Sequence, residues 1–242
     1  MHLSLEWGPT GAAALAPGCD VAVVVDTLTF STTVTVAADR DVRVRPYRWA
    51  AAAAGDEARR LQATLAVPRG AARPGDVSLS PATFRTADDL TRVVLPSPNG
   101  SMIGAVLAEA GADVVVASLR NRRAVADHLR SRGGRVLLVS AGERWPDDSL
   151  RPAIEDLWGA GGVAAAVLDG DPGVMATDET LAAAAAYRLV EDRLAEALLA
   201  CPSGQELREL GYASDVTIAA ELDASRAVPV LDDGWLVRSA RR

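Results

Sequence analysis

The sequence of 242 residues contains no lysine, and all 25 of its basic residues are arginine. A catalytic lysine Schiff base and the lysine of a phosphate-binding P-loop are therefore excluded. Any anionic ligand must be held by guanidinium groups, backbone amides or a metal ion. Histidine is also scarce, since only His2 and His128 are present. A zinc site built on histidines, or a nucleophile activated by histidine, is not expected.

Cysteine and long apolar runs are equally sparse. Two cysteines, Cys19 and Cys201, do not form a disulfide framework. No uncharged apolar run reaches the roughly 18 residues of a membrane span, and the first residues lack a signal-peptide pattern. These features predict a cytoplasmic protein. A net charge of −7 and a pI of about 4.9 disfavour nucleic acid or an anionic membrane as partners.

Hydrophobic residues make up 49% of the chain and aromatic residues only 4%, so a core of Ala, Val and Leu is expected. Short apolar runs recur between helical patterns, which is typical of buried strands in a largely parallel sheet. These runs are 21–25, 93–95, 114–116 and 136–139. The sequence therefore predicts an α/β fold, a layered α/β/α sandwich with a mixed, largely parallel sheet, in one domain over residues 1–242.

Other elements follow from the same patterns. A strand is expected at 42–45, a long loop at 68–81, and helices at 31–39, at 49–65, from about 152 and at 178–200. Another helix is expected to begin at Ser203, with Glu206 completing a capping box. The glycine-rich run 159–164 follows a helical pattern instead of a strand, so we interpret it as a helix break. Segments 228–231 and 235–237 predict an antiparallel hairpin.

Polar residues follow each of the four apolar runs within a few positions. They are Asp26, the segment Ser97-Pro98-Asn99-Gly100-Ser101, the pair Arg120-Asn121 and the pair Glu143-Arg144. Ligands of parallel sheets bind outside the carboxyl ends of the strands, so these residues are expected at one edge of the sheet. An acid, an amide turn and guanidinium groups at one edge predict a site for an anionic ligand, together with a metal.

The segment 97–101 predicts a tight turn that opens a helix. Free amides at such a helix start, with the side chains of Ser97, Asn99 and Ser101, suit a phosphate. The alternative is an ordinary strand-to-helix turn with a capping serine. Arg120 can place its guanidinium on a phosphate or carboxylate, and an ordinary surface position is an equal alternative.

Acidic residues cluster around 143–156. Glu143 follows a strand, and Glu155 and Asp156 lie in the first turn of the expected helix. One interpretation is that they interact favourably with the helix dipole. The other is that Asp26, Glu143 and one of Glu155 or Asp156 converge on a divalent cation, for which oxygen ligands select Mg²⁺.

Four short motifs in order carry a resemblance to a known family. They are Val23-Val24-Val25-Asp26-Thr27-Leu28 with Thr32-Thr33-Val34, Pro96-Ser97-Pro98-Asn99-Gly100-Ser101, Ser118-Leu119-Arg120-Asn121 with Ala124-Val125-Ala126, and Ala141-Gly142-Glu143 with Glu155-Asp156 and Ala160-Gly161. Together they resemble the 2-phosphosulfolactate phosphatase family. The resemblance implies an α/β sandwich with a mixed sheet and a Mg²⁺-dependent phosphatase of coenzyme M biosynthesis.

The chain departs from that pattern at two places. Thr29 stands where many relatives carry arginine, and the segment 68–81 retains only Arg69-Gly70 and Ser80-Pro81 of the expected motifs. Both changes remove candidate anion contacts. The family's substrate is consequently a weaker inference than its chemistry.

The leading hypothesis is a Mg²⁺-dependent phosphatase that hydrolyses the phosphate monoester of a small phosphorylated organic acid, with 2-phosphosulfolactate as the expected substrate. Asp26 acts as nucleophile or metal ligand. The catalytic candidates are Asp26, Arg120 and Asn121; the substrate-binding candidates are Ser97, Asn99, Gly100, Ser101, Arg144 and Arg151; the metal candidates are Asp26, Glu143, Glu155 and Asp156. The alternative is a non-catalytic family member that binds a small anionic metabolite. Assembly into a homo-oligomer stays open.

Overall fold

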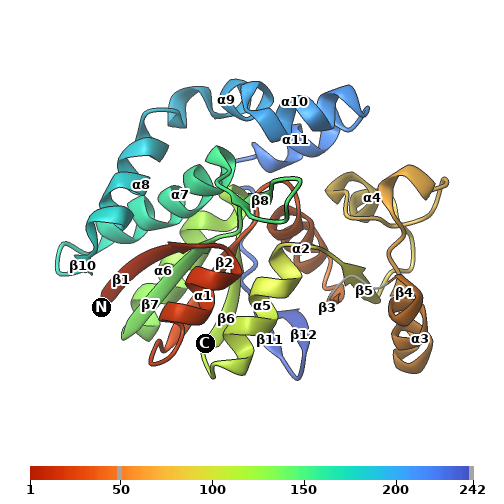
Figure 1. Cartoon of the computed structure of the whole chain (residues 1–242), viewed down its shortest axis with the longest axis horizontal. Coiled ribbons are helices and arrows are strands. Elements are labelled where there is room, and N and C mark those ends of the chain that lie inside the picture. The colour runs from red at the N-terminus through yellow and green to blue at the C-terminus, as the bar shows by residue number, and fades with distance from the viewer. Residues whose placement is uncertain (48–50, 240–242) are drawn as a thin grey trace.

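The computed structural model describes residues 1–47 and 51–239, and its main feature is a ten-stranded sheet with helices on both faces (Figure 1). The strand order is β10-β1-β7-β2-β6-β11-β12-β3-β5-β4. The bounds are β1 His2–Trp7, β2 Val21–Val25, β3 Arg43–Tyr47, β4 Thr64–Leu65, β5 Arg92–Pro96, β6 Asp113–Ala117, β7 Arg135–Ser140, β10 Met175–Ala176, β11 Pro229–Asp232 and β12 Trp235–Arg238. A small separate hairpin pairs β8 (Glu143–Arg144) with β9 (Leu150–Arg151). The predicted α/β class is confirmed.

Two parallel blocks make up the large sheet. One block contains β10, β1, β7, β2 and β6, and the other contains β3, β5 and β4. The predicted C-terminal hairpin, β11–β12, lies between them and pairs antiparallel with β6 on one side and β3 on the other. Three antiparallel pairings, β6–β11, β11–β12 and β12–β3, separate β6 from β3, so these two strands run in opposite directions. Because β2 is parallel to β6 and β5 is parallel to β3, β5 runs opposite to β2. The expectation that all four apolar strands end at the same edge is therefore wrong for β5.

Helices cover both faces because the side chains of β2 alternate between two cores. Ala22 and Val24 pack in a cluster with α1 (Gly8–Leu15), α2 (Phe30–Asp39) and α5 (Gly100–Glu109). Val23 and Val25 pack in a second cluster on the opposite face. That cluster includes side chains of α6 (Arg122–Arg132), α7 (Ile154–Gly170), α8 (Asp178–Arg188), α9 (Leu194–Ala200), α10 (Pro202–Glu209) and α11 (Ala213–Ala219). The predicted α/β/α layering follows from this alternation.

The remaining helices lie around the second block. α3 (Ala51–Leu61) packs on β5, and α4 (Pro81–Thr86) contacts α2. In Figure 1, α8 to α11 form an arc from one end of the sheet to a position above α4. Within the described residues, no helix combines the length and apolar character needed to cross a bilayer.

The predicted break at 159–164 is wrong, since α7 continues through it. The small residues there permit close packing instead. A Cβ at Gly161 would lie 2.0 Å from the carbonyl oxygen of Ala183 in α8, and one at Gly159 would lie 2.5 Å from Thr27 Oγ1. These glycines therefore let α7 approach α8 and the end of β2, as close helix contacts require.

Other local expectations also differ from the structure. α10 begins at Pro202 with Cys201 as its N-cap, and the Gly204 amide donates to Cys201 Sγ, so the predicted capping box at Ser203 is wrong. The helix expected at 178–200 is divided between α8 and α9. The helix expected at 49–65 ends at Leu61, where β4 soon follows, and residues 49 and 50 lie outside the described part. β1, in which polar and apolar residues alternate, was not predicted from the sequence.

Candidate functional site

Asp26 follows β2 directly, and all five residues of that strand are buried. Its Oδ1 accepts a hydrogen bond from the amide of Phe30 at 3.1 Å, and its Oδ2 accepts one from the amide of Gly100 at 3.0 Å. Burial raises the pKa of the Asp26 carboxyl to about 6, although these two amides act in the opposite direction. The carboxylate is therefore held rigidly at the point where β2, α2 and α5 meet.

The turn after β5 reaches Asp26 even though β5 runs opposite to β2. Gly100 begins α5, and a Cβ at this position would lie 2.2 Å from the ring of Phe30. Only glycine lets this amide approach the Asp26 carboxylate. The neighbouring Asn99 donates from Nδ2 to Glu143 Oε2 at 3.0 Å. Asn99 and Gly100 thus connect Asp26 to a second acidic residue.

Asp156 braces two of the loops around this site. Its Oδ1 accepts from the amide of Thr27 at 2.7 Å, and its Oδ2 accepts from the amide of Gly142 at 2.8 Å. Thr27 Oγ1 in turn donates to the carbonyl oxygen of Glu155 at 3.0 Å. Burial raises the pKa of Asp156 well above its usual range. Both oxygens of Asp156 are therefore occupied in tying the first turn of α7 to the ends of β2 and β7.

Glu143 and Glu155 complete the group of carboxyls. Burial, and then the negative charge of Asp26, raise the pKa of Glu143 to about 7, while its hydrogen bond with Asn99 lowers it. Glu155 also acts on the carboxyls of both Asp26 and Glu143 and raises their pKa values. Glu155 itself is only 2% exposed, and its Oε2 has no hydrogen-bond partner among the residues that the structure describes. A buried acceptor without a partner is rare in proteins.

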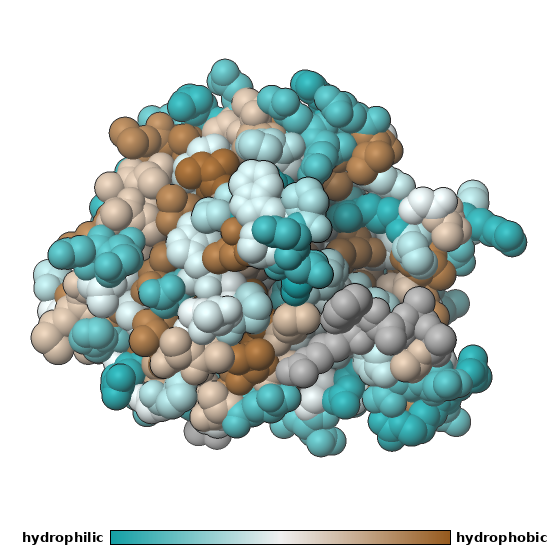
Figure 2. Space-filling view, in the orientation of Figure 1, coloured by the Kyte–Doolittle hydropathy of each residue, from teal (hydrophilic) through white to brown (hydrophobic). Residues whose placement is uncertain are grey.

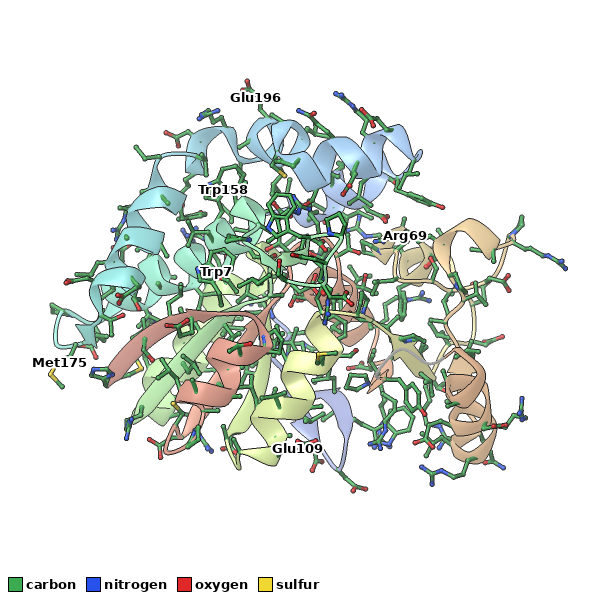
Figure 3. All side chains as sticks on the ribbon, in the orientation of Figure 1. Trp7, Arg69, Glu109, Trp158, Met175 and Glu196 are labelled. Carbon is green, nitrogen blue, oxygen red and sulfur yellow. The ribbon has the colours of Figure 1, made fainter. Side chains whose placement is uncertain are left out.

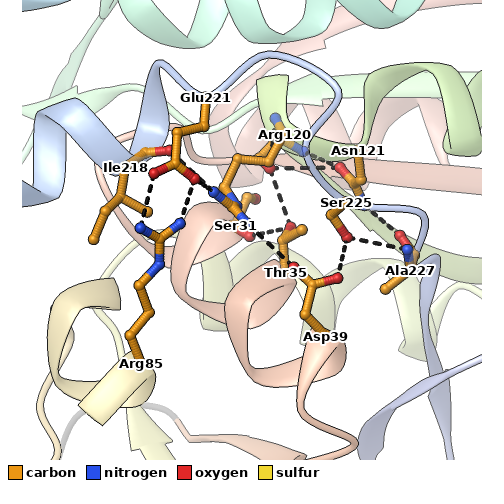
Figure 4. Close-up of polar contacts among 11 residues, drawn as sticks. Ser31, Thr35, Asp39, Arg85, Arg120, Asn121, Ile218, Glu221, Ser225 and Ala227 are labelled. Carbon is orange, nitrogen blue, oxygen red and sulfur yellow. Dashed lines mark hydrogen bonds and ion pairs between the residues drawn. The ribbon is translucent and has the colours of Figure 1, made fainter.

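Arg120 and Asn121 lie in a different network (Figure 4). The Arg120 guanidinium pairs with Glu221 through Nη1 and with Asp39 Oδ2 through Nη2 at 3.2 Å. Asn121 donates to the carbonyl oxygen of Ala227 at 2.9 Å, and its Oδ1 accepts from the amide of Ser118 at 2.8 Å. Their catalytic roles stay predictions, and the partners that the structure gives them are carboxylates and backbone groups.

The other substrate-binding candidates are dispersed. Ser101 Oγ lies 3.5 Å from the carbonyl oxygen of Leu95, and the buried Ser97 Oγ has no hydrogen-bond partner within the described part of the chain. Arg144 Nη1 lies 3.6 Å from Asp148 Oδ1 on the exposed hairpin. The Arg151 guanidinium lies 5.7 Å from the centre of the Trp145 ring and, by its charge, lowers the pKa of Glu143. The structure thus brings Arg151 toward the carboxyls, whereas the half-buried Arg144 lies near Asp148 and donates to Met102 Sδ at 3.5 Å.

Arg69 is a residue near the site that the sequence analysis did not select as a candidate. It belongs to the irregular segment 68–81, and its positive charge lowers the pKa of Asp26. It lies between α4 and the β8–β9 hairpin (Figure 3). In the space-filling view, the surface is hollowed between these two elements and bordered by hydrophilic residues (Figure 2). The sequence signal that could have indicated Arg69 was the retained pair Arg69-Gly70, but this pair does not show which residue Arg69 contacts.

The fold and the site together define a class of protein. It is an α/β protein with an acidic site at the end of the central strand β2, where amides from the starts of two helices hold the Asp26 carboxylate. The family model for 2-phosphosulpholactate phosphatase matches residues 13–234. The chain therefore belongs to the 2-phosphosulpholactate phosphatase family, and the predicted resemblance is confirmed.

Two relatives show the extent of the similarity. A protein of Methanothermobacter thermautotrophicus, named 2-phosphosulfolactate phosphatase, is 32% identical over 221 residues, which are 90% of this chain and 89% of that protein. A protein of Deinococcus radiodurans, named "Probable 2-phosphosulfolactate phosphatase", is 33% identical over 144 residues. That second match covers 59% of this chain and 57% of the relative. This chain therefore spans little more than half the length of the Deinococcus radiodurans protein.

Proposed function

We propose that this protein is a Mg²⁺-dependent phosphatase that hydrolyses 2-phosphosulfolactate to sulfolactate and phosphate. The observation that carries the proposal is the Asp26 carboxylate, fixed by the amides of Phe30 and Gly100 with Glu143 and Glu155 in electrostatic reach. Family membership and the names of both relatives support the reaction class and the substrate.

The acidic residues fit a hard divalent cation in their chemistry. Within residues 1–47 and 51–239, no three His, Cys, Asp or Glu side chains form a ready-made ligand group. However, Glu155 Oε2 is buried without a hydrogen-bond partner among the described residues, and the charges of neighbouring carboxyls raise the pKa values of Asp26 and Glu143. A bound cation would offset the repulsion between these negative charges. We propose that its ligands come from Asp26, Glu143, Glu155 and Asp156. Each oxygen of Asp26 and of Asp156 accepts one backbone hydrogen bond and would bind the cation through its second lone pair.

The residues of the chain then have distinct tasks. The bound Mg²⁺ would supply neutralisation of phosphoryl oxygens. Asn99 holds Glu143 and orients it toward the site through its side-chain amide. Asp156 keeps the loops after β2 and β7 in place, so that Asp26 and the start of α7 stay together. Asp26 serves as a ligand or as a carboxylate nucleophile that forms an aspartyl phosphate.

Phosphate release is the direct test. Purified protein with Mg²⁺ is incubated with 2-phosphosulfolactate, with other phosphorylated hydroxy acids and with an aryl phosphate. We expect the highest kcat/KM for 2-phosphosulfolactate. Binding of these compounds without any release of phosphate would instead support the non-catalytic alternative. Trapping with hydroxylamine separates the two roles of Asp26, because a hydroxamate at Asp26 forms only from an aspartyl phosphate.

The partners follow from this function. We propose a small anionic phosphorylated compound as the ligand and a cytoplasmic setting, with neither nucleic acid nor membrane as a partner. Support comes from the net charge of −7, which repels polyanions at neutral pH.

A further inference from the structure

A buried ion pair with no part in the roles described above lies close to Asp26. Its cation, Arg69, donates a hydrogen bond to Thr29, three residues after Asp26, and lowers the pKa of the Asp26 carboxyl. Arg69, in the segment 68–81, places its Nε 3.5 Å from Oδ2 of Asp215 in α11. The Asp215 side chain is fully buried, whereas 22% of the Arg69 side chain is exposed. The pair therefore reaches from the interior toward the surface, with the cation on the outer side.

The Arg69 guanidinium is fixed from several directions. Its Nη2 donates to Thr29 Oγ1 and to the carbonyl oxygen of Leu79, and its guanidinium carbon lies 5.7 Å from the centre of the Tyr212 ring. Nη1 takes part in none of the hydrogen bonds found in the described part of the chain. The Nη1 group of this rigidly held guanidinium is therefore available to bind an anion.

The ion pair itself is incompletely satisfied. Arg69 Nε and Asp215 Oδ2 are buried and 3.5 Å apart, which is long for a hydrogen bond, and among the described residues neither atom has another partner. Asp215 Oδ1 is held by Ser80 Oγ at 2.5 Å. A pair that only stabilised the fold would gain from the bidentate geometry that arginine and carboxylate favour. The observed geometry instead fixes Asp215 and leaves the guanidinium with capacity for another anion.

Charge balance points the same way. Asp26, Glu143 and Glu155 are acidic, and a phosphate monoester brings further negative charge. Among the described residues, Arg69 is the guanidinium that acts on the Asp26 carboxyl, whereas Arg120 is engaged by Asp39 and Glu221. A bound phosphoryl group beside Asp26 needs such a cation.

We propose that Arg69 binds the phosphoryl group of the substrate beside Asp26 and that Asp215 is the positioning residue that holds Arg69 there. The inference rests on the proposed phosphatase function. The segment 68–81 then has a defined task. Its residues Arg69 and Ser80 both contact Asp215 of α11, and this holds the Arg69 guanidinium near the end of β2.

The test uses inorganic phosphate as the probe, so that binding is measured without turnover. Phosphate affinity is determined by titration calorimetry and by the rise in Tm with phosphate concentration. Arg69→Ala should weaken phosphate binding by about 10- to 100-fold, the loss expected for one charge-assisted contact. Arg73→Ala is the matched control, since Arg73 is an exposed residue of the same segment. Equal phosphate affinity for wild type and Arg69→Ala would overturn the inference.

A double-mutant cycle tests the role of Asp215. Asp215→Asn should weaken phosphate binding by about 3- to 10-fold in the wild-type background, and it should have no further effect once Arg69 is alanine. A purely structural residue would weaken binding equally in both backgrounds, which would refute the positioning role. Should Asp215→Asn fail to fold, Ser80→Ala takes its place in the same cycle, because Ser80 holds Asp215 Oδ1.

The two proposals fail in different ways. If wild type cleaves 2-phosphosulfolactate and Arg69→Ala keeps the wild-type KM and phosphate affinity, the inference is wrong and the phosphatase function stands. If no substrate is cleaved while phosphate binding depends on Arg69, the function is wrong and the anion site stands.

Discussion

At the scale of single residues, Asp26 combines two tasks that are usually separate. Its oxygens accept amide hydrogen bonds from the starts of α2 and α5, which is structural work, and its charge lies among other acids. A substitution at this position is therefore expected to change both the stability and the activity of the protein.

Asp26→Asn should lower kcat by at least about 100-fold, or about 2.7 kcal/mol of barrier, because asparagine lacks the negative charge. It should also lower the free energy of unfolding by about 1–3 kcal/mol, since the amide NH₂ replaces one acceptor and faces a backbone N–H. Steady-state kinetics and urea unfolding measure the two effects. A kcat within tenfold of wild type would remove Asp26 from the chemistry.

The proximity of Asp26 and Glu143 was predictable from the sequence, since they follow the parallel neighbours β2 and β7. Asn99 and Gly100 were selected by the same rule, but they reach Asp26 from a strand that runs the opposite way. Position after a strand also selected Arg120 as a site candidate. The sequence does not show in which direction such a long side chain extends, and in the structure it extends toward two carboxylates. Its carboxylate partners, Asp39 and Glu221, are 81 and 101 residues away along the chain. Arg69 was passed over for the same reason, as its partner Asp215 lies far along the sequence in α11.

At the scale of secondary-structure elements, α7 depends on close contact with the end of β2. Gly159→Ala should lower the free energy of unfolding by about 1–3 kcal/mol, since the added Cβ would lie 2.5 Å from Thr27 Oγ1 and 2.7 Å from Val25 Cγ1. Gly104→Ala in α5 is the control, because no atom lies within 4 Å of its added Cβ. That variant should gain up to about 1 kcal/mol from helix propensity. Equal stability of both variants would contradict this account.

Glu221 connects α4 to the segment after β6, because it pairs with both Arg85 and Arg120. The hydrogen bond with Arg85, then that with Arg120, holds the pKa of Glu221 below its usual 4.5. A carboxyl whose pKa is lowered by folding stabilises the protein above the unfolded-state pKa, and this contribution is lost as pH falls through the lowered value.

Glu221→Gln should therefore cost about 1–2 kcal/mol of unfolding free energy at pH 7, and the deficit should shrink below pH 4.5. A third of the Glu221 side chain is exposed, which keeps the effect below that of a fully buried pair. Asp127→Asn, at an exposed pair with Arg130, should change stability by less than about 0.5 kcal/mol. A deficit for Glu221→Gln that is the same at pH 4 and pH 7 would argue against the ion pairs.

The strands were predictable because their apolar runs are short, β-branched and bounded by turns. The direction of β5 was not. It depends on β11 and β12, which lie far along the chain and reverse the sense of the sheet between β6 and β3. Local patterns carry no information about such an insertion.

At the scale of the whole molecule, metal removal tests whether a divalent cation neutralises the carboxylates of the acidic site and is needed for activity. Exhaustive chelation should abolish phosphate release, and added Mg²⁺ should restore it while Zn²⁺ does so poorly, because the ligands are hard oxygens. Metal binding should also raise Tm by relieving the repulsion among Asp26, Glu143 and Glu155. Undiminished turnover after chelation would exclude the metal from the reaction.

The hairpin β11–β12 also has a consequence for biosynthesis. During translation, β1 to β7 leave the ribosome well before residues 229–238, so both parallel blocks can form while their facing edges, β6 and β3, still lack partners. Unpaired edges of this kind invite pairing with other nascent chains. The late hairpin closes both edges at once, and its arrival therefore marks the moment at which the newly made protein becomes protected from aggregation.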